Sequence, residues 1–358
     1  MPEFGFHRVL TVIEMYLIYI LVFNYCKSKS NIYAVINIIV ITVFFEGILV
    51  ASEIILNKNL LALFIEGNAV SPIGKMGIIA SRRIEGSMGT PVMFGWITGF
   101  LFFILLPFAF IDNSKLKFNR KYILYSLFLV FGFGLLTMTR NALFGEILLA
   151  PLGIFLLSKY YNPRLKKWIP RLYIALIIVT TLFYLLPGAS EIISQRSSDS
   201  NEIEGSWAIR MNALNVGLRI LRAYPIFGMG VGMTSVYSVD LKILDPYFNN
   251  SEEQGDASYA GIHNGHAMMF AEMGFVGYII YLSFLISFLL KSYRLVRYSQ
   301  TTIFVQVGIV GLLTVCYVII SDFLGMALSI REGMFYFSLC LGMVSSSFKM
   351  NMEINKNV

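Results

Sequence analysis

Two of the chain's three histidines, His263 and His266, lie in a short stretch from Gly261 to Gly277 where a polar segment meets an apolar one. The long segment before this stretch is mixed and charged, and the chain after it is apolar as far as Leu290. A neutral imidazole at such a boundary can accept a proton from a substrate while the rest of its helix stays in lipid. The position predicts His263 as a general base, and the alternative is a structural histidine.

Two arginines have positions that suit binding an anion. Arg140 lies between two apolar tracts, where its charge is costly unless it faces a cavity or a partner or snorkels from a helix end. Arg210 lies in a predicted amphipathic helix, 206–223, and flanks its apolar stripe, so we expect it to point inward at the membrane rim. The stripe consists of Trp207, Met211, Leu214, Leu218 and Leu221. Arg219 and Arg222 belong to the opposite, solvated face of that helix.

The composition is that of a membrane protein. Hydrophobic residues make up 57% of the 358 positions and charged residues only 14%, whereas a soluble domain has about a quarter of its residues charged. The formal net charge of +7 is expected to reside in cytoplasmic loops, and we expect no nucleic-acid partner. Neither the three cysteines nor the His263–His266 pair completes a set of metal ligands, so no metal and no cofactor is expected.

The apolar runs predict an all-α, polytopic integral membrane protein with about nine transmembrane helices. The expected spans are 9–26, 32–56, 91–111, two within 122–158 that reverse near Arg140, 172–186, 267–290, 303–320 and 334–347. This gives three parts, which are an N-terminal transmembrane bundle (1–186), a large outer loop with the amphipathic helix (187–262) and C-terminal transmembrane helices (263–358).

The basic loops predict the orientation. The spans alternate consistently across the membrane if five basic segments all face the cytoplasm. These segments are the loops 27–30, 112–121, 159–171 and 291–297 and the tail from Lys349. The segments 57–90 and 187–262 and the reversal at Arg140 then face the other side, together with the N-terminus. The acidic bias of 187–262 suits an outer face.

One stretch resembles the signature of the O-antigen ligase and polymerase superfamily. It consists of His263-Asn264, nine further residues and then Gly274-x-x-Gly277. Thr-x-Thr-Arg at Arg140 resembles an arginine of that family, and Arg210 with the later Pro225-x-x-Gly-x-Gly turn resembles its second arginine. Members usually have further spans ahead of the region matching Val9, so either these helices are missing here or the chain begins at an internal start.

Weaker matches give possible supporting residues. Arg82 begins an Arg-x-x-Gly-like segment, and Asp322 and Arg331 resemble a late Ser-Asp pair and a following arginine of lipid A-core ligases. Each of these three is equally well explained as a charge at a helix end. Asn264, His266 and Arg219 complete the set of possible supporting residues.

The resemblance implies an enzyme at the periplasmic face of the bacterial inner membrane. Such an enzyme moves a preassembled glycan from an undecaprenyl-diphosphate donor to an acceptor hydroxyl, without a metal and with inversion at the anomeric carbon. His263 would be the catalytic base, and Arg140 and Arg210 would bind the diphosphate. The acceptor is lipid A-core in an O-antigen ligase and a carrier-linked repeat unit in an O-antigen polymerase. A polysaccharide transporter is a remote alternative.

The orientation can be tested with reporter fusions. Alkaline phosphatase fused after residue 165 should be inactive, because this basic loop is expected in the cytoplasm. Fusions within 57–90 or 187–262 should be active, and phosphatase activity at residue 165 would overturn the scheme.

Overall fold

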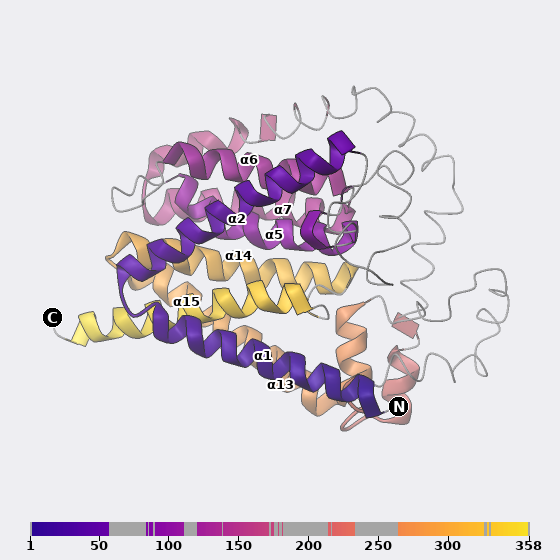
Figure 1. Ribbon diagram of the computed structural model, residues 1–358. Helices are drawn as coiled ribbons and strands as arrows, with labels where there is room; N and C mark the ends of the chain where they lie inside the picture. The colour runs from indigo at the N-terminus through magenta and orange to yellow at the C-terminus, as the bar shows by residue number, and fades with distance from the viewer. Residues whose placement is uncertain are drawn as a thin grey trace.

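The computed structural model describes residues 2–56, 84, 86–88, 90–110, 120–137, 139–171, 173–174, 178, 181, 214–215, 217–232, 264–325, 328 and 331–356. This part of the chain is helical and contains no strand. Its principal elements are α1 (Pro2–Tyr25), α2 (Lys29–Leu56), η2 (Gly86–Met88), α5 (Pro91–Ala109), α6 (Arg120–Thr137), α7 (Arg140–Tyr160), η3 (Pro163–Lys167), α13 (Gly265–Tyr298), α14 (Thr302–Leu324) and α15 (Arg331–Lys356). They form one bundle of long helices (Figure 1).

Seven of the described helices are long and apolar enough to cross a membrane, namely α1, α2, α5, α6, α7, α13 and α14. They confirm seven of the predicted spans, including the reversal between α6 and α7. The predicted span 172–186 lies largely outside the described residues. The ninth, 334–347, falls on α15, where three consecutive serines and Lys349 lower the hydropathy. The all-α membrane fold is confirmed, but the count of nine is not.

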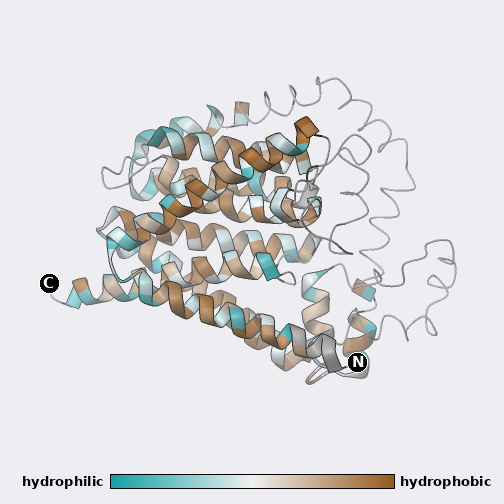
Figure 2. Cartoon of the chain, in the orientation of Figure 1, coloured by the Kyte–Doolittle hydropathy of each residue, from teal (hydrophilic) through white to brown (hydrophobic). Residues whose placement is uncertain are grey.

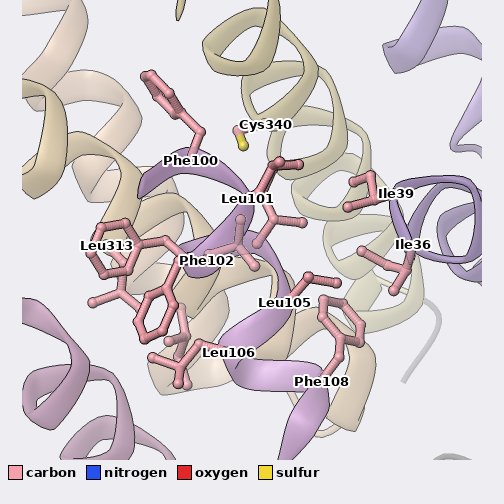
Figure 3. Packing of buried hydrophobic residues seen from close by; sticks show 14 of the residues in the cluster. Ile36, Ile39, Phe100, Leu101, Phe102, Leu105, Leu106, Phe108, Leu313 and Cys340 are labelled. Atoms are coloured by element: carbon pink, nitrogen blue, oxygen red, sulfur yellow. The ribbon is translucent and has the colours of Figure 1, made fainter. Parts of the chain in front are cut away.

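Two helices, α5 and α14, are buried on nearly all sides at the centre of the bundle. Helix α5 begins at Pro91 after Thr90, whose side chain accepts a hydrogen bond from the backbone N–H of Met93 at 3.3 Å and so caps the helix. Its phenylalanines and leucines pack against side chains of α2, α14 and α15 (Figure 3). A helix that is apolar all round is expected in such a central position.

Small residues allow α5, α7 and α14 to approach closely around one ring. A Cβ added to Gly99 of α5 would lie 2.2 Å from the ring of Tyr317 of α14, and one added to Gly145 of α7 would lie 2.8 Å from it. The phenol of Tyr317 donates a hydrogen bond to the backbone carbonyl of Trp96 at 3.0 Å. Glycines at helix interfaces provide this kind of close contact in membranes.

The helix directions alternate, so that α2, α6 and α14 end where α5, α7, α13 and α15 begin (Figure 1). We call this the site end of the bundle; it is on the right in Figure 1. Polar residues gather near the opposite ends of several helices, while the middle of the bundle is largely apolar (Figure 2). The described residues of the basic loops 27–30 and 159–171 and of 291–297 lie at that opposite end, as the predicted alternation requires.

Two buried glutamates of α2 fix η2 at the site end. The carboxylate of Glu53 accepts a hydrogen bond from the backbone N–H of Gly86 at 3.0 Å. The carboxylate of Glu46 accepts one from the N–H of Ser87 at 3.1 Å and another from its hydroxyl. Glu46 and Glu53 are seven residues apart and therefore share one face of α2. They hold the chain as it returns to the bundle before α5.

The contact between Glu53 and η2 can be tested by Glu53→Ala. The change leaves a buried backbone N–H without its acceptor, which should lower the free energy of unfolding by about 1–3 kcal/mol. Ser52→Ala is the matched control, because the Ser52 hydroxyl bonds to its own helix on the exposed side. Unfolding of both variants in detergent is the measurement, and equal stability of the two would contradict the role of Glu53.

Candidate functional site

The α6–α7 reversal is held by two threonines. The hydroxyl of Thr137 donates to the carbonyl of Gly134 at 2.8 Å, and its oxygen accepts from the N–H of Thr139 at 3.3 Å. The hydroxyl of Thr139 donates to the carbonyl of Pro91 at 3.1 Å and so ties the turn to the start of α5. The two threonines of the Thr-x-Thr-Arg motif therefore fix the turn that places Arg140 at the first position of α7.

The packing of α7 against α14 sets the depth of Arg140. The two helices are antiparallel, and Gly145 of α7 lies against Tyr317 of α14. Moving five residues toward the start of α7 and five toward the end of α14 brings Arg140 level with Asp322. The backbone of Arg140 is thus at the site end, near the end of α14.

A second arginine-bearing segment, the helix over 217–223, lies on the first turns of α13. A Cβ added to Gly217 would lie 2.9 Å from the Cβ of Ala267. Ile220 is buried in a small apolar cluster with Ala267, Met268 and Ala271. Arg219 and Arg222 are exposed, as the sequence predicted for the polar face, but Leu218 of the predicted apolar stripe is also exposed.

Helix α13 is broken at Gly274, a feature that the predicted continuous span 267–290 missed. Gly274 has a φ of 62° and a ψ of −166°, outside the helical region. The break separates a short arm, 265–273, from a long arm, 275–298. Figure 1 shows the short arm standing at an angle to the long arm beside the segment 217–232.

The loop 225–230 fills this break. In a continuous helix the N–H groups of Phe275 and Val276 would bond to the carbonyls of Ala271 and Glu272. Here the loop supplies a partner to each of these four groups. The bonds are Phe275 N–H to Pro225 O (2.9 Å), Val276 N–H to Ile226 O (3.1 Å), Met229 N–H to Ala271 O (2.9 Å) and Gly230 N–H to Glu272 O (3.0 Å). The Pro225-x-x-Gly-x-Gly turn is therefore the part that completes α13.

Asn264 fixes the start of α13. Its side-chain oxygen accepts a hydrogen bond from the N–H of Ala267 at 2.9 Å, and its amide nitrogen donates to the carbonyl of Phe323 at 2.9 Å. The N–H of Gly265 donates to the carbonyl of Gly325 at 2.6 Å. The residue that follows the predicted base His263 is thus both a helix cap and a tie to the end of α14.

Both ring nitrogens of His266 are hydrogen-bonded. Nε2 lies 3.2 Å from the backbone carbonyl oxygen of Ile319, and Nδ1 lies 3.2 Å from the phenol oxygen of Tyr278. A carbonyl oxygen only accepts, so Nε2 carries the hydrogen, and in the neutral ring Nδ1 accepts from Tyr278. This arrangement orients His266 and occupies the nitrogen that a base would use.

Asp322 is buried at the end of α14 and joins three segments. Its carboxylate accepts from the hydroxyl of Tyr281 at 3.1 Å and from the N–H of Leu328 at 3.1 Å. A Cβ added to Gly265 would lie 2.8 Å from the Asp322 side chain. Asp322 therefore ties the long arm of α13 and the connection to α15 to the end of α14, and it lies close against the start of the short arm.

Arg331 forms a two-pronged pair with Glu14. Its Nε and Nη2 lie 2.9 Å from the two carboxylate oxygens of Glu14 in α1. The pair is exposed and joins the start of α15 to α1. A supporting role for Arg331 in the site stays a prediction, and the contact that the structure shows for it is the one with Glu14.

The structure describes the predicted site only in part. His263, Arg210 and Arg82 lie outside the described residues, and Arg140 is described by its backbone alone. Segments near three of these positions nevertheless lie at the site end, namely the start of α7, the helix over 217–223 and the start of α13. Among the described residues no group of three or more His, Cys, Asp or Glu could hold a metal, and metal independence stays a prediction.

Two tyrosines, Tyr278 and Tyr281, were not singled out from the sequence. They lie three residues apart on the long arm of α13 and contact His266 and Asp322. Their spacing in the sequence indicates that they share a helix face, because residues three apart do so. It does not indicate their partners, which lie in the short arm and in α14. Their position could be recognised only once the break at Gly274 was known.

The model of the family described as O-Antigen ligase matches residues 125–282. The matched region begins in α6, includes Arg140, Arg210, Arg219 and His263, and ends in the long arm of α13. The match confirms the family resemblance read from the motifs and supports an enzyme of the ligase or polymerase type. No curated protein matches the chain.

The role of the break in α13 can be tested with Gly274→Ala. An added Cβ would lie 2.4 Å from the backbone nitrogen of Gly228 and 2.5 Å from the carbonyl oxygen of Ile226. The positive φ of Gly274 is also unfavourable for alanine. We expect the free energy of unfolding to fall by more than about 2 kcal/mol.

The control is Gly132→Ala in α6, where an added Cβ meets nothing within 4 Å. This variant should be as stable as wild type or more stable, by up to about 1 kcal/mol. Thermal unfolding of both variants in detergent is the readout. A Gly274→Ala protein as stable as Gly132→Ala would show that the loop does not need the break.

Proposed function

We propose that this chain, whose residues 125–282 carry a domain of the O-antigen ligase family, is an O-antigen ligase. It transfers a preassembled O-antigen glycan from undecaprenyl diphosphate to lipid A-core at the periplasmic face of the bacterial inner membrane. The family match carries this proposal. Its supporting observation is that the start of α7, the helix over 217–223 and the start of α13 lie at one end of the bundle.

In this mechanism His263 is the general base. The acceptor hydroxyl gives its proton to the imidazole while its oxygen attacks the anomeric carbon of the donor glycan. The bond between that carbon and the diphosphate oxygen breaks, and the electron pair leaves with the lipid diphosphate. One base and one leaving group imply a single displacement, so the anomeric configuration inverts.

Arg140 and Arg210 bind the diphosphate and stabilise the charge that develops on it. The planar guanidinium presents two parallel N–H donors to phosphate oxygens, which a lysine cannot reproduce. Preorganised charge at the leaving group is a large contribution to catalysis. The fixed threonine turn before Arg140 supplies that preorganisation on the α7 side.

Asn264, His266 and Asp322 are positioning residues in this proposal. Asn264 fastens the start of α13 to the end of α14, Asp322 ties the long arm to the end of α14, and His266 contacts both α14 and the long arm. These contacts support the proposal because His263 immediately precedes Asn264, whose own position they fix. His266 leaves the role of base to His263, since its own nitrogens are both bonded within the protein.

The test is transfer in detergent by the purified protein with an undecaprenyl-diphosphate-linked glycan and either of two acceptors. A ligase should glycosylate lipid A-core and leave a carrier-linked repeat unit unextended. Extension of the repeat unit without transfer to lipid A-core would assign the chain to the polymerases. Absence of transfer to both, with movement of the lipid-linked glycan across vesicles, would assign it to transporters.

His263→Ala should lower the transfer rate by about 10²- to 10⁴-fold, the contribution of a general base. His7→Ala is the control for loss of a histidine elsewhere. Transfer by His263→Ala at the wild-type rate would remove the base assignment.

Arg140→Lys should lower the rate by about 10- to 100-fold, which corresponds to one lost charge-assisted hydrogen bond. Arg222→Lys is the control, because Arg222 lies on the exposed face of its helix. Equal rates for the two lysine variants would contradict diphosphate binding by the Arg140 guanidinium.

A further inference from the structure

Helices α1, α13 and α15 enclose an apolar groove away from the central core. Its volume is about 440 Å³. It is lined from all three helices, by Val12 and Tyr16 of α1, Phe284 and Phe288 of α13, and Phe337 and Leu341 of α15. Tyr16 and Phe284 are also exposed on the outside of the bundle. The groove is therefore accessible from the lipid phase.

One end of the groove adjoins the candidate site. Tyr281 and Leu328 line this end, and both donate hydrogen bonds to the carboxylate of Asp322. The cation of Arg331 is nearby at the start of α15, but it is bound to Glu14. Arg8 of α1, whose guanidinium lies 3.5 Å from the sulfur of Met268, is also near this end. Among the described residues no charged side chain lines this end of the groove.

The other end has a charged side chain in its lining. Lys291 lines it together with Ser345 and Tyr19. Lys291 is the one charged side chain among the described residues that line the groove, and it is exposed. It begins the basic turns at the end of α13, which continue with Arg294 and Arg297. This end suits an anion held at the membrane surface.

We propose that the groove binds an anionic phospholipid from the leaflet opposite the candidate site. One acyl chain lies along the groove, where its methylenes leave water and contact the aromatic lining. The phosphate lies at the ammonium group of Lys291, near the serine hydroxyl of Ser345. A single lipid then contacts α1, α13 and α15 together.

The charge pattern distinguishes this lipid from the proposed glycan donor. A donor lying in the groove would put its diphosphate at the end next to Asp322 and its uncharged tail at Lys291. The second placement would leave the ammonium group of Lys291, the one charged lining group among the described residues, beside an apolar chain. The arginines proposed to bind the diphosphate belong to α7 and to the predicted helix 206–223, and no described residue of either lines this groove.

The experiment is native mass spectrometry of the purified full chain with phosphatidylglycerol or phosphatidylcholine of identical acyl chains. Wild type should retain phosphatidylglycerol in preference to phosphatidylcholine. Lys291→Gln should lower retention of phosphatidylglycerol about fivefold, the usual contribution of one basic residue at an anionic lipid surface. Its retention should then match that of phosphatidylcholine.

Two further variants keep the test specific. Arg294→Gln removes the same charge from the same end of α13 outside the groove lining, and it should bind like wild type. Ser287→Phe narrows the groove from the exposed face of α13 and should lower retention of both lipids. Together they separate the groove and its lysine from a generally basic surface.

Three results would overturn the proposal. These are equal retention of the two lipids by wild type, equal losses in Lys291→Gln and Arg294→Gln, or displacement of phosphatidylglycerol one for one by undecaprenyl phosphate. The last result would assign the groove to the glycan donor. None of these outcomes depends on whether the chain is a ligase, because the assay measures lipid binding alone.

Discussion

The arrangement of the site end depends on the backbone hydrogen bonds at the break in α13. Backbone groups in a membrane protein need internal partners, because lipid offers none. At Gly274 two N–H groups and two carbonyls lose their partners within the helix, and the loop 225–230 replaces all four. The loop and the break therefore require each other, and the close approach of Gly228 and Gly274 leaves no room for a side chain on either.

This exchange has consequences for the proposed chemistry. It lets the short arm of α13 leave the direction of the long arm, so His266 can reach both α14 and Tyr278. It also anchors the segment that follows the arginine-bearing helix, whose Ile220 packs on the short arm. In a continuous α13, His266 and Tyr278 would be twelve residues apart along one helix and about 18 Å from each other. The break thus connects two motifs that are far apart in the sequence.

Carboxylates fix the irregular segments around this arrangement. Glu46 and Glu53 hold η2, and Asp322 holds the residue Leu328 in the connection to α15. In each case a buried carboxylate accepts a backbone N–H that lies outside a regular helix, which stabilises the charged group as well as the turn. Polar contacts therefore fix these irregular segments of the site end, while a large apolar core packs the helices of the bundle together.

The sequence predicted the features that depend on hydropathy. Apolar runs predicted seven helices that the structure confirms, and the polar residues around Arg140 predicted the α6–α7 reversal. The break at Gly274 was missed because Gly274 lies in an apolar run that is long enough for a straight span. Its cause is a tertiary contact with the loop 225–230, which hydropathy does not report. Glu46 and Glu53 also lie in an apolar run. Their hydrogen-bond partners in η2 are likewise far away in the sequence, so hydropathy does not report these contacts either.

The central claim is the proposal that Arg140, Arg210 and His263 act together on one lipid-linked donor at the site end. The most direct measurement is an electron cryomicroscopy structure of the protein bound to a non-transferable undecaprenyl-diphosphate glycan. The account predicts the diphosphate between the guanidinium groups of Arg140 and Arg210, with the imidazole of His263 facing the anomeric carbon. A diphosphate bound elsewhere, with these three side chains on separate faces of the protein, would contradict it.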